Sequence, residues 1–124
     1  MKKAISTPNA PAAIGPYSQA IEVNGMIYTS GVIPVNPATG EIPATVEEQA
    51  EQAFSNMAAL LKDAGSSMEN VVKTTVFLSD IADFAAMNEV YKQYYQSECP
   101  ARSAFAVKSL PMGALVEIET IAGK

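Results

Sequence analysis

Apolar residues recur at helical spacing in two stretches of the chain and predict two helices. The first stripe consists of Val46, Ala50, Ala53, Met57, Leu60 and Ala64. Thr45 and Glu48 have the spacing of a capping box at its start, and Gly65 is suited to its end. The second stripe, which predicts a helix from Asp80 to a point before Pro100, consists of Ile81, Phe84, Met87, Tyr91 and Tyr94.

Apolar segments with β-branched or alternating residues predict five strands. Two of them, 20–23 and 26–29, flank Asn24-Gly25, which is the strongest short hairpin signal. The other three strands are expected at 71–78, 103–108 and 115–122. The first twenty residues contain Pro8, Pro11 and Pro16 and are interpreted as an ordered loop or an edge segment.

This order of elements predicts an α+β fold with one mixed sheet and both helices packed on one of its faces. Simple alternation along 71–78 places Val72, Val76 and Leu78 on one side and Val71 and Phe77 on the other. The face without helices would therefore carry apolar side chains. A sheet with such a face commonly binds another subunit, so an oligomer is expected.

Length, composition and charge limit the classes of function. The 124 residues predict a single domain, 1–124, and 48% hydrophobic residues with 17% charged ones indicate a folded chain. No apolar run approaches the roughly 20 residues of a membrane span, and the first residues do not form a secretory signal. Cys99 is the only cysteine, so no internal disulfide is possible and a cytoplasmic location is expected.

Nucleic acid and metal are both disfavoured as partners. The net charge is −5 and the seven lysines are scattered, whereas phosphate binding needs clustered cations. With no histidine and one cysteine, the chain lacks the ligands for zinc or copper. We therefore expect no metal.

Arg102 and Glu117 are the leading candidates for chemistry. Arg102 is the only arginine, and a guanidinium can hold a planar anion through two parallel hydrogen bonds. Glu117 follows on the last predicted strand and shares a side with Glu119, and the turn at 110–113 could return that strand beside Arg102. One interpretation is an anion clamp beside a general base in one cleft. Structural ion pairing, of Arg102 with any carboxylate or across the strands with Glu117, is the alternative.

Other nucleophiles and loops give weaker signals. Ser30 and Ser103 have no histidine to activate them, which excludes a serine triad. Tyr17 follows Gly15-Pro16 and could present its hydroxyl to a ligand, or its ring could pack over the edge of the sheet.

Taken together, six segments along the whole chain resemble the RidA/YjgF family of imine deaminases. They are 10–19, 28–34, 72–78, 87–91, and 100–103 with 116–119. The resemblance implies a chorismate-mutase-like fold with a mixed six-stranded sheet, a homotrimer, and sites between subunits. It also implies hydrolysis of 2-iminobutanoate and 2-iminopropanoate, the latter in equilibrium with 2-aminoacrylate, to 2-keto acids and ammonia without a cofactor. These reactive acids are released by pyridoxal-phosphate enzymes, which the reaction would protect.

The resemblance also assigns roles to residues. Arg102 matches the arginine that grips the substrate carboxylate, and Glu117 matches the glutamate that positions and can deprotonate the attacking water. Residues of the matching loops that would line the cleft, together with the backbone after the arginine, are Tyr17, Ser30, Gly31, Ser103 and Ala104. Ala104 stands where many relatives have cysteine, which puts thiol-dependent behaviour in doubt but not deamination through backbone contacts.

Three other functions compete with this one. The same cleft could bind a keto acid or amino acid as a signal without turnover. Chorismate mutase activity rests on the fold alone, and its dianionic substrate would want several cations where this chain has one arginine. Nucleic-acid processing, described for some relatives, fits poorly with an acidic chain that has no histidine.

Overall fold

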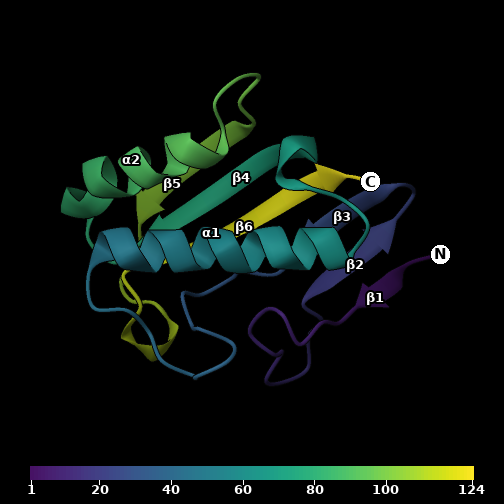
Figure 1. Ribbon diagram of the computed structural model, residues 1–124, viewed down its shortest axis with the longest axis horizontal. Helices are drawn as coiled ribbons and strands as arrows, with labels where there is room; N and C mark the ends of the chain where they lie inside the picture. Colours follow the sequence, from purple (N-terminus) through teal and green to yellow (C-terminus); the bar gives the residue numbers. More distant parts are fainter.

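A computed structural model describes residues 1–124 and contains one six-stranded sheet with two helices on one face (Figure 1). This confirms the α+β class with a mixed sheet. The strands are β1 (Lys3–Ile5), β2 (Ala20–Val23), β3 (Met26–Thr29), β4 (Val71–Leu78), β5 (Ala101–Ala106) and β6 (Val116–Gly123). The helices are α1 (Val46–Asp63) and α2 (Phe84–Tyr94), and the start of the chain supplies the edge strand β1.

The strand order is β1-β2-β3-β6-β4-β5, and only the β4–β5 pair is parallel. The expectation that the last strand returns beside the Arg102 strand is therefore wrong, because β4 lies between β5 and β6. The chain after β5 crosses the end of β4: the Val107 N–H donates to the Leu78 carbonyl at 2.8 Å, and the Ser79 N–H donates to the Leu115 carbonyl at 3.1 Å. This crossing inserts β6 between β3 and β4.

Local signals place the start and end of α1 as expected. Thr45 is the N-cap and forms the full capping box with Glu48. Gly65 follows the last helical turn with φ +88°, a conformation that a side chain would strain. The second helix begins later than expected: Asp80 caps a short 3₁₀ turn, Ile81–Asp83, and α2 starts at Phe84.

A β-bulge at the start of β4 reverses the expected orientation of two valines. Val71 pairs with Ala122 and Lys73 pairs with Ile121, so one extra residue of β4 lies between them. Val71 is consequently buried with the core, while Val72 is 51% exposed. The expected placement holds from Val76 to Leu78, where Phe77 lies on the face away from the helices.

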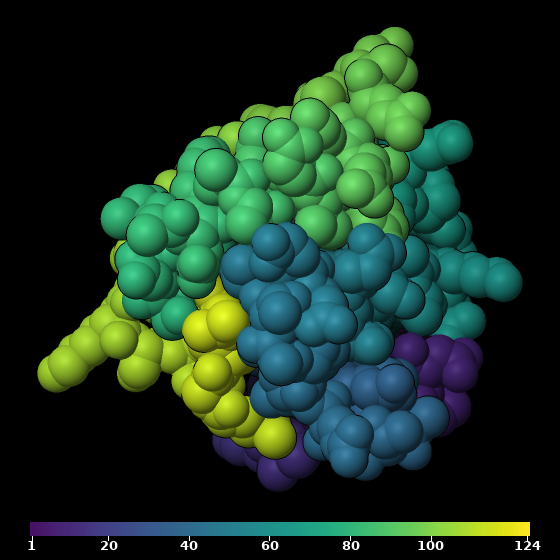
Figure 2. Space-filling model, turned by 60° about the vertical axis from the view of Figure 1, so that its left-hand side comes forward, coloured from purple at the N-terminus to yellow at the C-terminus, as the bar shows by residue number.

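The core fills the space between the sheet and the two helices, which lie side by side at the molecular surface (Figure 2). Phe54 of α1 packs edge-on against Tyr91 of α2, with ring centroids 5.6 Å apart. On the opposite face of the sheet, Phe77 and Phe105 form a T-shaped pair at 5.5 Å. That face carries no helix, so the expected uncovered face with apolar side chains is confirmed. Neither helix combines the length and apolarity needed to cross a membrane.

Candidate functional site

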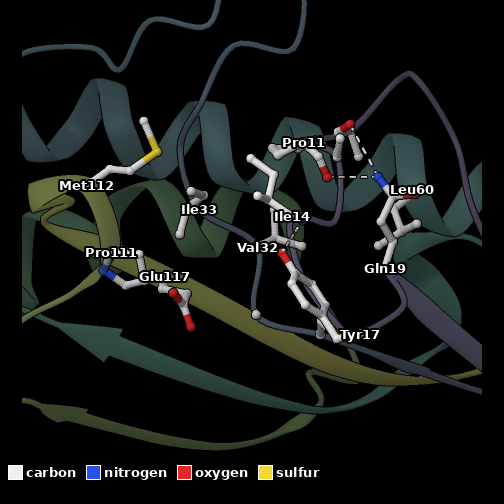
Figure 3. Close-up of a pocket in the computed structure, with 14 residues that line it drawn as sticks. Pro11, Ile14, Tyr17, Gln19, Val32, Ile33, Leu60, Pro111, Met112 and Glu117 are labelled. Atoms are coloured by element: carbon white, nitrogen blue, oxygen red, sulfur yellow. Dashed lines mark hydrogen bonds between the residues drawn. The ribbon is translucent and has the colours of Figure 1, made fainter.

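A cavity of about 370 Å³ lies where the N-terminal loop, the segment after β3 and the start of β6 meet (Figure 3). It holds four of the residues predicted from the sequence: Tyr17, Ser30, Gly31 and Glu117. Most of the remaining lining is apolar and comes from Ala10, Pro11, Ala12, Ile14, Gln19, Val32, Ile33, Leu60, Pro111 and Met112. The cavity is thus an apolar space with a single carboxylate.

Gln19 fixes the N-terminal wall of this cavity. Its side-chain amide is buried and donates to the Pro11 carbonyl at 2.8 Å and the Thr7 carbonyl at 3.1 Å (the Pro11 bond is among those dashed in Figure 3). Its Oε1 accepts from the Thr7 N–H at 2.6 Å. One amide therefore replaces the ladder hydrogen bonds that a proline-rich loop cannot make.

The segment after β3 lies directly against β6. Val32 and Ile118 exchange two backbone hydrogen bonds, of 2.7 and 3.1 Å, and this pairing places Gly31 beside Glu117. A Cβ added at Gly31 would overlap the Glu117 carboxylate and come within 2.8 Å of its Cδ. A side chain at position 31 would therefore displace the Glu117 carboxylate from its present position.

Glu117 is half-buried at this point, and its environment favours the protonated acid. Burial raises the pKa of the Glu117 carboxyl, and the neighbouring charge of Glu119 raises it further. A carboxylate with a raised pKa can accept a proton more readily than an exposed one. No three acidic or cysteine side chains come together in a group that could hold a metal ion.

Ser30 and Tyr17 provide polar atoms at the cavity wall. The Ser30 hydroxyl donates to the Ser18 carbonyl at 2.6 Å, so its oxygen can still accept from a ligand. The Tyr17 side chain is 52% exposed, and its hydroxyl accepts from the Ile14 N–H at 3.4 Å. The ring therefore lines the cavity rather than lying buried over the edge of the sheet.

The other three predicted residues lie together on the edge strand β5, outside this cavity. Arg102 pairs with Thr74 and faces the helices, whereas Glu117 pairs with Phe77 and faces away from them. Two strand spacings and three residues of rise separate the two Cα atoms by about 14 Å. The expectation of a cleft shared by Arg102 and Glu117 is therefore wrong within one chain.

Ser103 and Ala104 occupy different sides of β5. The Ser103 hydroxyl accepts from Lys73 Nζ at 3.2 Å on the uncovered face. Ala104 is partly buried against the core. The seven candidate residues thus form two separate groups, four in the cavity and three consecutive residues on the edge strand.

The two ion pairs of the chain are Lys92–Glu89 and Lys124–Glu22. Arg102 makes none, so the alternative of a structural salt bridge within the chain is wrong. Its Nη1 donates instead to Asn88 Oδ1 at 2.6 Å. Asn88 is not among the residues predicted from the sequence, although its place in the helical repeat, seven residues after Ile81 and three before Tyr91, puts it on the helix face that packs against the sheet.

Known proteins match this chain over nearly its whole length. The family model described as Endoribonuclease L-PSP matches residues 7–124. A goat (Capra hircus) protein named 2-iminobutanoate/2-iminopropanoate deaminase is 54% identical over 123 residues, which is 98% of this chain and 90% of the relative. The crystal structure of YyfA of the Rid family from Yersinia pestis matches with a TM-score of 0.97 and 48% identity over all of both chains. That of TdcF from E. coli with bound serine has a TM-score of 0.94 and 47% identity over 98% of each.

Proposed function

The chain belongs to the RidA/YjgF family, whose model is described as Endoribonuclease L-PSP, and from this premise we propose that it is a 2-iminobutanoate/2-iminopropanoate deaminase. The observation that carries the proposal is identity above one half to a deaminase along 98% of the chain. The reaction removes reactive 2-imino acids and their enamine forms, including 2-aminoacrylate. Pyridoxal-phosphate enzymes that release these compounds would be protected by it. The protein acts as one domain, residues 1–124, in the cytoplasm.

The chemistry is the addition of water to a carbon–nitrogen double bond. A water oxygen bonds to C2 of the imine, the π pair moves to nitrogen, and nitrogen takes up a proton. In the resulting carbinolamine the hydroxyl proton moves to nitrogen, the C=O double bond forms as the C–N bond breaks, and the 2-keto acid and ammonia are released. No redox change occurs, so the site has only to place one water against an electrophilic carbon and move protons.

Glu117 is the residue that positions this water and accepts its proton. Its raised pKa and half-buried position at the cavity wall support this role. Tyr17, Ser30 and Gly31 line the same cavity and would surround the reacting atoms. The apolar lining suits the short alkyl group of 2-iminobutanoate and keeps other waters away from the imine.

Arg102 binds the substrate carboxylate, with the backbone around Ser103 and Ala104 completing the contact. Since Arg102 lies on the opposite face from Glu117, we propose that a complete site needs two subunits: the cavity of one and the β5 edge of the next. A homotrimer with a chorismate-mutase-like arrangement would supply three such sites. The apolar side chains on the uncovered face, Phe77 and Phe105 among them, support burial of that face between subunits.

A coupled assay tests the activity. A threonine or serine dehydratase generates the imine, and its decay is followed with and without this protein. We expect the imine to decay faster with the protein. An unchanged decay rate would leave only the alternative hypothesis, in which the cleft binds a keto acid or amino acid without turnover. Glu117→Gln distinguishes the two hypotheses further, because a protein that only binds a carboxylate needs no base. In a deaminase, turnover should fall in this variant while 2-keto acid binding is kept.

The family description refers to ribonucleases, yet this chain is acidic and its lysines are dispersed. We expect no retention on immobilised RNA at low salt. Retention that weakens steeply with salt concentration would instead indicate phosphate contacts.

A further inference from the structure

Three side chains of α2 surround the Arg102 guanidinium. The Tyr91 ring centroid lies 4.6 Å from Arg102 Cζ, and the Phe84 centroid lies 5.2 Å from it. Between them in the sequence, Asn88 accepts the hydrogen bond from Nη1 at 2.6 Å. Positions 84, 88 and 91 have the spacing of one helical face, so a single stripe of α2 contacts the guanidinium. We call these three residues the arginine cradle.

Tyr91 of the cradle is itself held in place by residues of the core. The Tyr91 hydroxyl is hydrogen-bonded at 2.8 Å to the hydroxyl of Thr74, a fully buried residue that is the strand neighbour of Arg102. Tyr91 also packs against Phe54 and Tyr95. The ring under the guanidinium therefore has little freedom to move.

The cradle leaves the charge of Arg102 without a counter-ion in the chain. Its hydrogen bond and its two cation–π contacts all come from neutral groups, an amide oxygen and two π faces. A carboxylate at position 88 would satisfy Nη1 equally well, but it would also neutralise the charge that a substrate carboxylate needs. Nε and Nη2 of Arg102 have no partner in the chain, so two N–H groups stay available for a bidentate contact.

We infer that the arginine cradle is a positioning device that orients Arg102 and keeps its charge unneutralised for the substrate carboxylate, with Asn88 as the positioning residue for carboxylate affinity. This inference rests on the proposed deaminase function. It assigns to α2, which contributes nothing to the cavity around Glu117, a role in substrate affinity.

Asn88→Asp tests the inference because it keeps the size and the acceptor but adds a negative charge beside the guanidinium. KM for the imine should rise about tenfold or more, since two carboxylates would then compete for one guanidinium. The affinity for 2-oxobutanoate, measured by calorimetry, should fall by a similar factor. The kcat should change much less, and the melting temperature should not fall, because an Asp–Arg pair replaces an Asn–Arg one. Gln93→Glu adds the same charge to an exposed position of α2 and should leave KM unchanged.

Asn88→Ala provides the second measurement. It removes the acceptor without adding charge, so KM should rise less than in Asn88→Asp while kcat is largely kept. A merely structural asparagine would give the reverse pattern: a lower melting temperature in Asn88→Ala with KM unchanged in both variants, which overturns the inference. If the unmodified protein neither hydrolyses the imine nor binds 2-oxobutanoate, the proposed function fails and the inference fails with it. If the unmodified protein is active and Asn88→Asp matches it in KM, only the inference fails.

Discussion

A mixture of two defective variants should recover activity, because Arg102 and Glu117 lie on opposite faces of the sheet. Arg102→Met removes the guanidinium but keeps an apolar stem over the Phe84 and Tyr91 rings. Glu117→Gln keeps the shape of the side chain but removes the base. The carboxylate contact of Arg102 is charge-assisted and contributes about 1.5–3 kcal/mol, so its loss should lower kcat/KM about 10- to 150-fold.

The recovery follows from the geometry of the proposed site. With Cα atoms about 14 Å apart and side chains pointing to opposite faces, one chain cannot bring both groups to one small substrate. A site built from two neighbouring subunits is intact when the Glu117→Gln chain supplies Arg102 and the Arg102→Met chain supplies Glu117. In oligomers assembled from an equal mixture, about one site in four meets this condition.

The assay uses the two variants with different affinity tags, refolded together and purified over both tags. The two-tag purification removes trimers made of one variant alone, and each mixed trimer has one complete site of its three, so the dehydratase-coupled assay should give roughly a third of the unmodified activity. A matched control mixes Arg102→Met with the double variant that carries both substitutions, in which no site can hold both groups. Activity no higher than the mean of the two parent variants would refute a site shared between subunits.

Four further predictions concern the cavity. Because burial and Glu119 raise the pKa of Glu117, kcat/KM should fall as the pH drops through that raised pKa. Glu119→Gln should move this fall to lower pH. The same pH profile in this variant and in the unmodified protein would contradict the role of Glu117 as the base. The raised pKa also links Glu117 to stability: its contribution to folding is fully present below the unfolded-state pKa and is lost as the pH rises through the folded-state pKa. Glu117→Gln should therefore raise the urea midpoint at neutral pH and leave it unchanged at low pH. Gly31→Ala should lower kcat about tenfold or more by displacing the Glu117 carboxylate, whereas Gly123→Ala, whose Cβ would make an ordinary 3.9 Å contact, should not. Equal kcat in both variants would contradict the idea that the present position of the carboxylate matters for catalysis. Gln19→Met leaves the buried Thr7 N–H without its acceptor and should cost about 1–3 kcal/mol in urea unfolding, with a raised KM; an unchanged midpoint would show that the loop is held by other contacts.

Signals that depend on a few adjacent residues predicted the structure well. The capping box of Thr45 and Glu48 and the Asn24-Gly25 turn specify their own backbone conformations, so no distant contact was needed to place α1 or the β2–β3 hairpin. Strand order was different. A short connection after β5 suggested that β6 returns beside it, but β5 has little to bury and remains at the edge. The central place goes to β6, which buries every second side chain from Val116 to Ala122.

The identities of the candidate site residues could be predicted, but not how they group. Arg102 and Glu117 were placed in one cleft on the assumption that their strands were neighbours. Which face each occupies depends on its register with β4, and that register follows from packing across the whole sheet. The role of Asn88 was missed for a related reason, since its partner Arg102 becomes visible only when α2 is docked over β5.

The β-bulge at Val72 acts like a frameshift in the alternation of side chains along β4. Residues 73–78 follow one frame of alternation, and Val71 follows the other. Deleting Val72 would join the two frames into a regular ladder and keep Val71 against Ala122. Deleting any one residue from Thr74 to Phe77 would instead turn core side chains outward. An insertion-and-deletion scan of β4 should therefore find a single tolerated gap, at the bulge, in a strand that otherwise accepts none.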